Sequence, residues 1–244
     1  GEKIMFPTTV AQYGLGCWDL FLETGNNEYW RGAEAAARWL LEHVDSRGGW
    51  DASAGLQRGY SAMTQGEAAS LLIRVGVRTK NHNYICVAER ALELLLQKRE
   101  DGGTARQEGL DIFLEEDPTG KYPGILNGWV FALFGLFDGA IATKRVDFRE
   151  AFNRGCDTLV RNIERYDAGF WSYYDLAGHL VSPFYHVLHI AQLTVLGDLT
   201  GRKELTAVAE RWSAYKRSVP GLLKAVAIKA VQKLREPSDV IVVR

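Results

Sequence analysis

The chain has 244 residues, of which 47% are hydrophobic and 24% charged, the proportions of an ordinary globular protein long enough to bury a sizeable core. Its formal net charge of −1 excludes the strongly positive field of a dedicated nucleic-acid binder. The cysteines Cys17, Cys86 and Cys156 are odd in number and far apart, so we expect reduced thiols, with no disulfide framework and no metal site.

The start of the chain bears on its location. No early stretch follows the order of a signal peptide, in which basic residues precede an apolar and then a small-residue segment. No apolar run reads as long enough to span a bilayer. We therefore expect a cytoplasmic or membrane-peripheral protein, and we leave an upstream signal or domain open because the chain starts at Gly-Glu-Lys-Ile-Met-Phe.

Gly and Pro clusters divide the chain into helical segments that come in pairs. The first member of each pair is apolar almost all round, as expected of an enclosed helix, and the second carries charges on one face, as expected of an outer helix. The inner segments are 10–25, 63–79, 125–143 and 190–201, and the outer ones are 28–45, 84–98, 148–167 and 204–219. Because one pair cannot bury its inner face alone, the pattern predicts an all-α fold over residues 1–219, an incomplete α/α toroid of about four inner and outer helix pairs.

An amide side chain recurs near the start of each inner segment. Any one of these amides has a structural interpretation, a hydrogen bond to neighbouring backbone. Together they favour a polar ring at one mouth of the toroid, because amides both donate to and accept from sugar hydroxyls. The four residues are Gln12, Gln65, Asn127 and Gln192.

Residues 109–122 interrupt the helical rhythm between the second and third pairs. Alternating apolar residues at 109–115 predict a short strand, and 117–120 predict a turn, so we expect a β-hairpin near 109–122 that leans over the mouth. It carries the adjacent acids Glu115, Glu116 and Asp117. These are either solvated or, over a polar cleft, include a buried base.

Three outer segments end at glycine turns, at 47–50, 100–104 and 167–171. The aromatic residues in and after these turns have two interpretations: they cap the core, or they line the mouth and stack on the apolar face of a sugar. They are Trp50, Trp171, Tyr173 and Tyr174.

His186 and His189 lie three residues apart, on one face of the last inner segment, with Tyr185 beside them. The sequence has no Glu-x-x-His pattern to support a metal there. Two interpretations stay open: the histidines are hydrogen-bonded inside the toroid, or a Tyr–His pair faces a substrate.

The residues after 219 form a separate segment, which we take as an amphipathic helix and tail, 220–244. This segment has an apolar stripe with basic residues away from it. It docks on the toroid or a second copy of the chain, or it contacts an anionic membrane surface through 221–235. The stripe is Leu222, Leu223, Val226, Ala230, Val231 and Leu234, and the basic residues are Lys224, Lys229, Lys233 and Arg235.

The chain lacks a Gly-x-Ser-x-Gly elbow, a phosphate-binding loop and a dinucleotide fingerprint. This argues against nucleophilic serine chemistry, nucleotide hydrolysis and hydride transfer. What remains is acid–base chemistry by Tyr, Glu and His, without a cofactor, on a substrate rich in hydroxyls.

Five segments, in order, resemble the C-terminal helical domain of the D-glucuronyl C5-epimerases of heparan sulfate and heparosan synthesis. They are 9–19, 62–74, 115–138, 173–176 and 184–193. The resemblance implies an α/α toroid that acts on a glucuronic-acid polysaccharide and inverts C5 to give iduronate without a cofactor.

The resemblance also implies site residues. By position, the family's catalytic residues fall on Glu116, Tyr174 and Tyr185. Two positions depart from the family, Asp117 for a tyrosine and Ala177 for an arginine. With these, we expect a substrate-binding set of Gln12, Tyr13, Arg58, Gln65, Asp117, Lys121, Tyr122, Asn127, Trp171, His186, His189 and Gln192.

The chemistry suits such residues. Removing a proton next to a carboxylate builds charge on an existing anion, so the site must neutralise that carboxylate, and inversion needs an acid or base on each face of the ring. We place Tyr185 on one face and Glu116 on the other, with Tyr174 binding the carboxylate or relaying a proton. His186, Arg58 or Lys121 stands in for the missing cation.

Three alternatives stay open. A uronate lyase forms the same carbanion and expels the 4-linked sugar. A non-catalytic glycan-binding module explains Asp117 and Ala177. A glycoside hydrolase is the weakest of the three, because the acids all come from one loop and that mechanism needs carboxylates that flank the bond.

Overall fold

The computed structural model describes residues 5–53 and 59–235. These residues form nine α-helices, two short 3-10 helices and one two-stranded sheet, and they pack into two compact units. The N-terminal unit comprises residues 3–121 and 128–158, and the C-terminal unit contains 122–127 and the chain from 159 onward.

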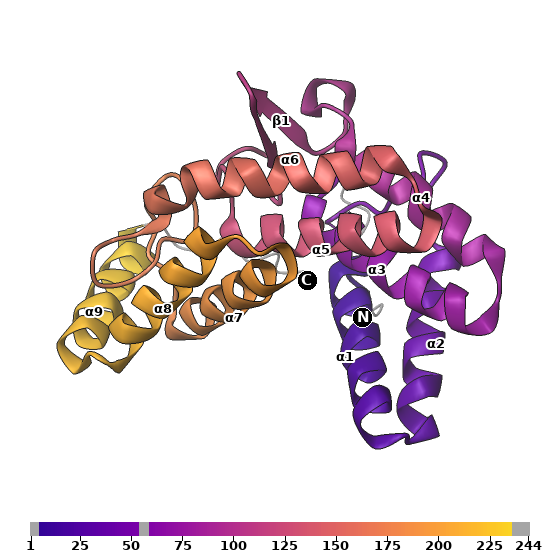
Figure 1. The fold of residues 1–244 in the computed structure, drawn as a ribbon, viewed down its shortest axis with the longest axis horizontal. Coiled ribbons are helices and arrows are strands. Elements are labelled where there is room, and N and C mark those ends of the chain that lie inside the picture. The colour runs from indigo at the N-terminus through magenta and orange to yellow at the C-terminus, as the bar shows by residue number, and fades with distance from the viewer. Residues whose placement is uncertain (1–4, 54–58, 236–244) are drawn as a thin grey trace. The chain divides into compact units, whose positions relative to one another are not determined.

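The N-terminal unit is built from helix pairs (Figure 1). Polar residues set the helix starts: Asn26 caps α2 and Ser61 caps α3, each accepting a backbone N–H of the first turn. The pair α1 and α2 turns at Gly25, which has φ of 69°, a left-handed conformation that glycine adopts without strain. The helices are α1 (Pro7–Thr24), α2 (Asn27–Glu42), α3 (Ala62–Thr79), α4 (His82–Leu96), α5 (Leu126–Thr143) and α6 (Val146–Asn162).

Glycines let the inner helices α3 and α5 approach until their backbones touch. A Cβ added to Gly66 would lie 2.6 Å from the Cα of Ala132, and one on Gly135 would lie 2.5 Å from the carbonyl oxygen of Gly66. Both distances are too short for any side chain. The small residues of the inner segments therefore set how closely these helices pack.

The C-terminal unit contains α7 (Pro183–Thr200), α8 (Lys203–Arg217) and α9 (Val219–Arg235). Ser182 caps α7 and Pro183 occupies its first position, where a missing N–H costs nothing. Trp171, Leu180 and Val181, from the segment before α7, form a core with Ala225 of α9. With α7 paired to α8, the prediction of four inner and outer helix pairs is confirmed, and with it the all-α fold class, an incomplete α/α toroid.

The hairpin is present, but its turn differs from the predicted one. Strand β1 (Ala105–Glu108) pairs antiparallel with β2 (Asp111–Leu114) through the two-residue turn Gly109–Leu110. The predicted turn at 117–120 is a separate loop, in which Asp117 accepts hydrogen bonds from the backbone and hydroxyl of Thr119. The polar strand 105–108 was missed because it lacks an apolar alternation.

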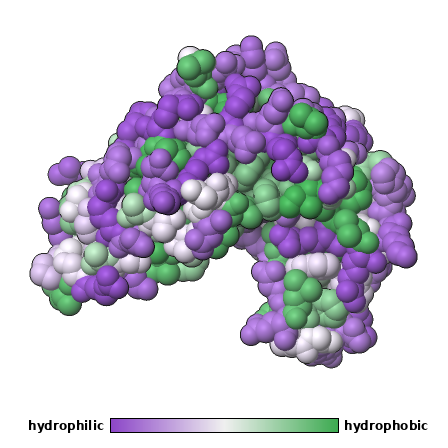
Figure 2. All heavy atoms as spheres, in the orientation of Figure 1, coloured by the Kyte–Doolittle hydropathy of each residue, from purple (hydrophilic) through white to green (hydrophobic). Residues whose placement is uncertain are grey.

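Most of the apolar stripe of α9 faces away from its own unit, contrary to the predicted docking on the toroid, while docking on a second copy of the chain stays a prediction. The buried residues of α9 are Gly221 and Ala225, whereas Leu223 and Leu234 are 65% and 84% exposed. Small residues allow closer contact with the unit than leucines do, so the helix turns its larger side chains outward. Hydrophobic residues accordingly reach the surface at the end formed by α7–α9 (Figure 2).

One prediction about hydrophobic length was wrong. Within the described residues, α5 is by length and composition apolar enough to cross a membrane. However, 61% of this helix is buried, as in a core helix.

Candidate functional site

Glu116 lies on the loop between β2 and α5, half-buried, against the first turn of α5. The contact is at Gly128, where an added Cβ would overlap the Glu116 carboxylate, so only glycine leaves space for it. Unpaired backbone N–H groups give a helix N-terminus a partial positive charge, which favours an ionised carboxylate at this position. The fold therefore provides space and a favourable electrostatic environment for the carboxylate of Glu116, which was predicted to act on the substrate.

A second acid, Glu67, lies deep in the same unit, and the sequence analysis missed it. Glu67 is 3% exposed, and its Oε1 accepts a hydrogen bond of 3.3 Å from Nε2 of Gln12. The pKa of Glu67 is raised to about 8, chiefly by burial and also by the charge of Glu116, while the hydrogen bond from Gln12 acts in the opposite direction. Its signal in the sequence was a lone acid inside an otherwise uncharged stretch of an inner segment, directly after Gln65 and Gly66.

Gln65 has the structural role. Its Nε2 donates to the carbonyl of Trp50 at 2.9 Å, and its Oε1 accepts from the backbone N–H of the same residue at 3.3 Å. Gln65 and Trp50 are both buried. Their expected contact with a sugar is therefore wrong: the amide holds the loop before α3 in place.

The sequence neighbours of Glu116, Glu115 and Asp117, stabilise the hairpin and the loop by hydrogen bonds. The side chain of Glu115 is buried and accepts a 2.6 Å hydrogen bond from Nε of Arg106 on β1. Asp117 closes the turn with Thr119, which explains why an aspartate stands there, and Lys121 is exposed. Of the three adjacent acids, Glu116 is the one whose carboxylate contacts the N-terminal turn of a helix, α5.

A cavity of about 430 Å³ opens beside this loop, between residues 59–60 and 99–118. Its walls include Tyr60, Arg99, Thr104 and Glu115, so it presents a phenol, a guanidinium and a hydroxyl. The Tyr60 hydroxyl donates to Asp45 at 2.5 Å, and burial raises the pKa of Tyr60 to about 12, so this phenol stays neutral. Tyr60 and Arg99 were not among the predicted site residues, because neither belongs to a recognisable motif.

Two further predicted residues lie elsewhere. Tyr13 is 61% exposed and lines an apolar groove between α1 and α2 with Trp39 and Ala36, so it faces α2 and not α3, toward which Gln12 points. Arg58 lies outside the described residues.

The C-terminal unit brings two predicted phenols together. The rings of Tyr174 and Tyr185 meet edge to face with their centroids 5.6 Å apart. The Tyr174 backbone is fixed by hydrogen bonds to His179 and Leu126, and Tyr185 lies in the first turn of α7. Tyr185 is partly exposed and therefore accessible to a ligand.

The two histidines have the structural role that was left open. His186 and His189 are fully buried, and Nδ1 of each is hydrogen-bonded to the Ser172 hydroxyl, at 2.8 and 3.2 Å. Burial lowers the pKa of His186 to about 4 and that of His189 to about 3, so both are neutral at pH 7. His186 therefore does not supply the missing cation.

Trp171 is also a core residue. It is 1% exposed, it stacks on His186 with ring centroids 3.8 Å apart, and its indole N–H donates to the carbonyl of Val181. Both ring faces are covered by protein, so the predicted stacking on a sugar is wrong.

The remaining amides lie together. Nε2 of Gln192 donates to the backbone carbonyl of Asn127 at 3.0 Å, and both residues are nearly buried. Gln12 and Gln65 belong to the N-terminal unit and this pair to the C-terminal unit. The single ring of four amides stays a prediction.

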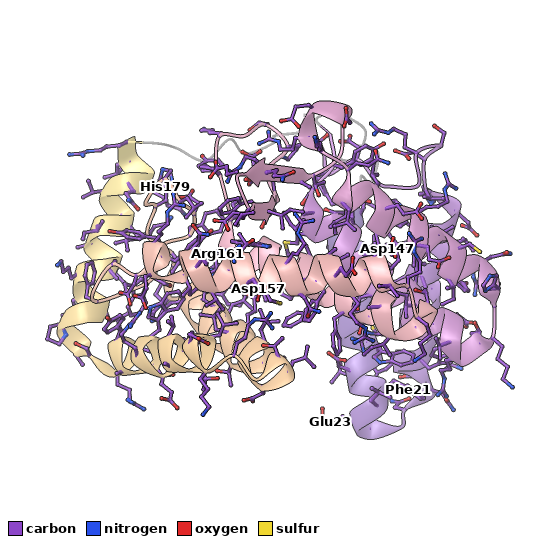
Figure 3. All side chains as sticks on the ribbon, turned by 45° about the horizontal axis from the view of Figure 1, so that its top comes forward. Phe21, Glu23, Asp147, Asp157, Arg161 and His179 are labelled. Carbon is purple, nitrogen blue, oxygen red and sulfur yellow. The ribbon has the colours of Figure 1, made fainter. Side chains whose placement is uncertain are left out.

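Beside the phenols, a carboxylate holds a histidine that the sequence analysis did not select. The carboxylate of Asp175 is buried and accepts from Nδ1 of His179 at 2.7 Å, as well as from the backbone N–H groups of Ala177 and His179. The ring of Tyr122 lies 5.5 Å from that of His179, which sits beside α9 (Figure 3). The Asp175 carboxylate therefore fixes the orientation of the His179 ring.

The chain is similar to known proteins over most of its length. Residues 44–214 match the family model described as "D-glucuronyl C5-epimerase C-terminus". The D-glucuronyl C5-epimerase of Caenorhabditis elegans is 28% identical over 212 residues, which cover 74% of this chain and 34% of the relative. An uncharacterized protein of Methanocaldococcus jannaschii is 25% identical over 162 residues, which cover 64% of this chain and 53% of the relative. The chain thus spans about a third to a half of the length of these curated relatives.

Solved structures share the fold at low identity. A D-mannose isomerase has a TM-score of 0.59 at 12% identity, covering 85% of this chain and 58% of the isomerase. An unsaturated glucuronyl hydrolase specific for heparin has a TM-score of 0.53 at 12% identity, covering 90% of this chain and 63% of the hydrolase. These likenesses show the fold. Because the family model matches most of its length, the chain belongs to the family of the D-glucuronyl C5-epimerase C-terminus.

Proposed function

We propose that this chain is the carbohydrate epimerase domain of a protein that inverts C5 of D-glucuronate residues in a heparosan-like polysaccharide. The observation that carries the proposal is the phenol pair Tyr174–Tyr185, with ring centroids 5.6 Å apart, at the two tyrosine positions that the family resemblance marks. The relative from Caenorhabditis elegans is named for the same reaction.

The reaction needs one group to remove the C5 proton and another to return a proton from the opposite face. A tyrosine is a poor base at pH 7 unless neighbouring donors or cations stabilise the phenolate, whereas a carboxylate accepts a proton readily. Following the family resemblance, we assign Glu116 and Tyr185 as these two groups, and Tyr174 to binding the uronate carboxylate or relaying a proton. No cofactor enters this scheme.

A cation near the uronate carboxylate would lower the barrier, because negative charge builds up on that group as the C5 proton leaves. We assign to His179, whose ring is held at Nδ1 by Asp175, a hydrogen bond to this carboxylate. His179 then binds the uronate carboxylate in place of the arginine that is absent at Ala177.

The test is exchange of the C5 proton into heavy water, followed by proton NMR of heparosan incubated with the protein. Tyr185→Phe removes the hydroxyl and keeps the ring contact with Tyr174, so we expect exchange to fall at least a hundredfold. Tyr29→Phe, on α2 in the other unit, is the matched control and should exchange like the wild type.

The same reaction mixture separates the alternatives. Undiminished exchange in Tyr185→Phe would reject the assignment of that phenol. A rise in ultraviolet absorbance would identify β-elimination and a lyase. Binding of heparosan by the wild type without any exchange would identify a glycan-binding module.

A further inference from the structure

We propose that Glu67 and Glu116 act as one acid pair, in which Glu67 holds a proton and thereby keeps Glu116 as the single charged carboxylate. Glu67 is then a positioning residue that acts through Glu116. This inference rests on the proposed function for its catalytic consequence, and on the geometry of the N-terminal unit for the pair itself.

The environment of Glu67 disfavours a charge. The side chain is 3% exposed, and its one hydrogen bond from a described residue comes from the neutral amide of Gln12. Its Oε2 is buried and has no hydrogen-bond partner among the described residues. An ionised carboxylate would need several donors at such a place, while a carboxylic acid needs fewer.

No cation from the neighbouring elements compensates Glu67 within the described part of the chain. α2 buries alanine and leucine side chains, and α1 offers the Gln12 amide. On α4, Arg90 donates to the backbone carbonyl of Ser46, and on α5, Asp138 is paired with Arg74. Glu116 lies on Gly128 of α5, one turn before Ala132. Gly66 packs against Ala132, and Glu67 follows Gly66 in α3. The charge that acts on Glu67 is accordingly that of Glu116, and it has the same sign.

The environment of Glu116, unlike that of Glu67, favours a charged carboxylate. It is only half-buried, and it lies on Gly128 at the positive end of α5. Two carboxyl groups whose surroundings differ in this way divide the roles of acid and base. The proton therefore resides on Glu67 and the negative charge on Glu116, in agreement with the raised pKa of Glu67, about 8.

The consequence for proton transfer is electrostatic. Glu116 takes the proton from C5 while the electron pair of the C–H bond moves into the uronate carboxyl group, and a proton returned to C5 on the opposite face restores the C–H bond. A second negative charge on Glu67 would repel the anionic substrate. Activity should therefore fall as the pH rises through about 8.

Glu67→Gln tests the role, because the amide keeps the size and the hydrogen-bonding capacity and cannot ionise. The expected result is C5 exchange within about threefold of the wild type at pH 6.5, and loss of the alkaline decline near pH 8. The exposed Glu23→Gln, at the end of α1 (Figure 3), is the control and should keep that decline. An unchanged alkaline decline in Glu67→Gln would overturn the inference.

A second measurement does not depend on activity. Folded protein keeps the Glu67 proton up to about pH 8, whereas the unfolded chain releases it near the ordinary value, so stability falls as the pH rises through this window. Urea denaturation should show the folding equilibrium constant falling by up to tenfold for each pH unit in the wild type and staying nearly flat in Glu67→Gln.

 In Glu116→Gln, this loss of stability should shift to lower pH. Removing the repelling charge of Glu116 lowers the pKa of Glu67, so the loss of stability ends at a lower pH than in the wild type.

The two measurements separate the two proposals. Absence of exchange in the wild type, with the stability pattern intact, would reject the epimerase activity and leave the acid pair standing. A pH dependence of stability that is the same in Glu67→Gln as in the wild type would overturn the pair, whatever the activity.

Discussion

At the scale of single residues, the site depends on which polar groups are charged. His186 and His189 sit among Trp171, Trp212 and Ser172, where burial lowers the pKa of both imidazoles. They are structural groups that stay neutral at pH 7. The candidate that titrates near neutral pH is instead Glu67.

The buried histidines predict acid sensitivity. The unfolded chain takes up protons on these residues below about pH 6.5, and the folded chain does so only near pH 4 and below, so stability is lost as the pH falls through this window. His189→Asn keeps a polar partner for Ser172 and cannot titrate, so urea denaturation at pH 7 and pH 5 should show a smaller acid loss than in the wild type. The exposed His82→Asn should leave the loss unchanged; an equal effect of both variants would contradict this explanation.

The sequence was sufficient for some residues and not for others. Tyr174 and Tyr185 were selected together, and they are in contact, because a motif marks each of them. Glu67 was missed because its neighbours in sequence are small and polar, and only the packing of α1 on α3 reveals that it is buried. Trp171 was misassigned because an aromatic residue after a glycine turn looks the same whether it faces a cleft or the core.

At the scale of helices and strands, the first turn of α5 positions the carboxylate of Glu116. Gly128→Ala adds a single methyl group that overlaps this carboxylate, so we expect C5 exchange to fall at least tenfold, since small misplacements of reacting groups are costly. Helix propensity itself favours alanine, so the helix should persist. Gly16→Ala, in α1 with nothing within 4 Å of the added Cβ, is the matched control, and far-ultraviolet circular dichroism checks the fold of both. Equal exchange rates in the two variants would show that Glu116 does not act from this position.

The helix α9 shows how far hydrophobic pattern predicts docking. It carries apolar residues on most of its circumference, so the pattern gave a stripe, and the smaller residues on the other side make the contact. Ala225→Glu would bury a charge and should lower the free energy of unfolding by roughly 2 kcal/mol or more, whereas Leu234→Glu should change it by less than about 0.5 kcal/mol. Urea denaturation of both variants measures the difference, and the reverse order would mean that the stripe docks.

At the scale of the whole molecule, the alternation of apolar and amphipathic segments was enough to predict four helix pairs and the all-α class. That periodicity is a property of each segment, so it can be recognised in the sequence without knowing which segments pack together. The division into two compact units was not predictable in this way, because it depends on contacts between residues distant in the chain, such as the approach of 122–127 to 159 and beyond. The predicted boundary at residue 219 stays a prediction.

The contact between Gly66 and Gly135 has a consequence for how this domain can change. The distance between α3 and α5 is limited by main-chain atoms, which no substitution can shorten or trim. In a core filled by leucines, a substitution by a larger residue at one position can be compensated by a smaller residue at a neighbouring position. Here the spacing of α3 and α5 has no such compensation, so any side chain larger than hydrogen at Gly66 or Gly135 has to push the two helices apart.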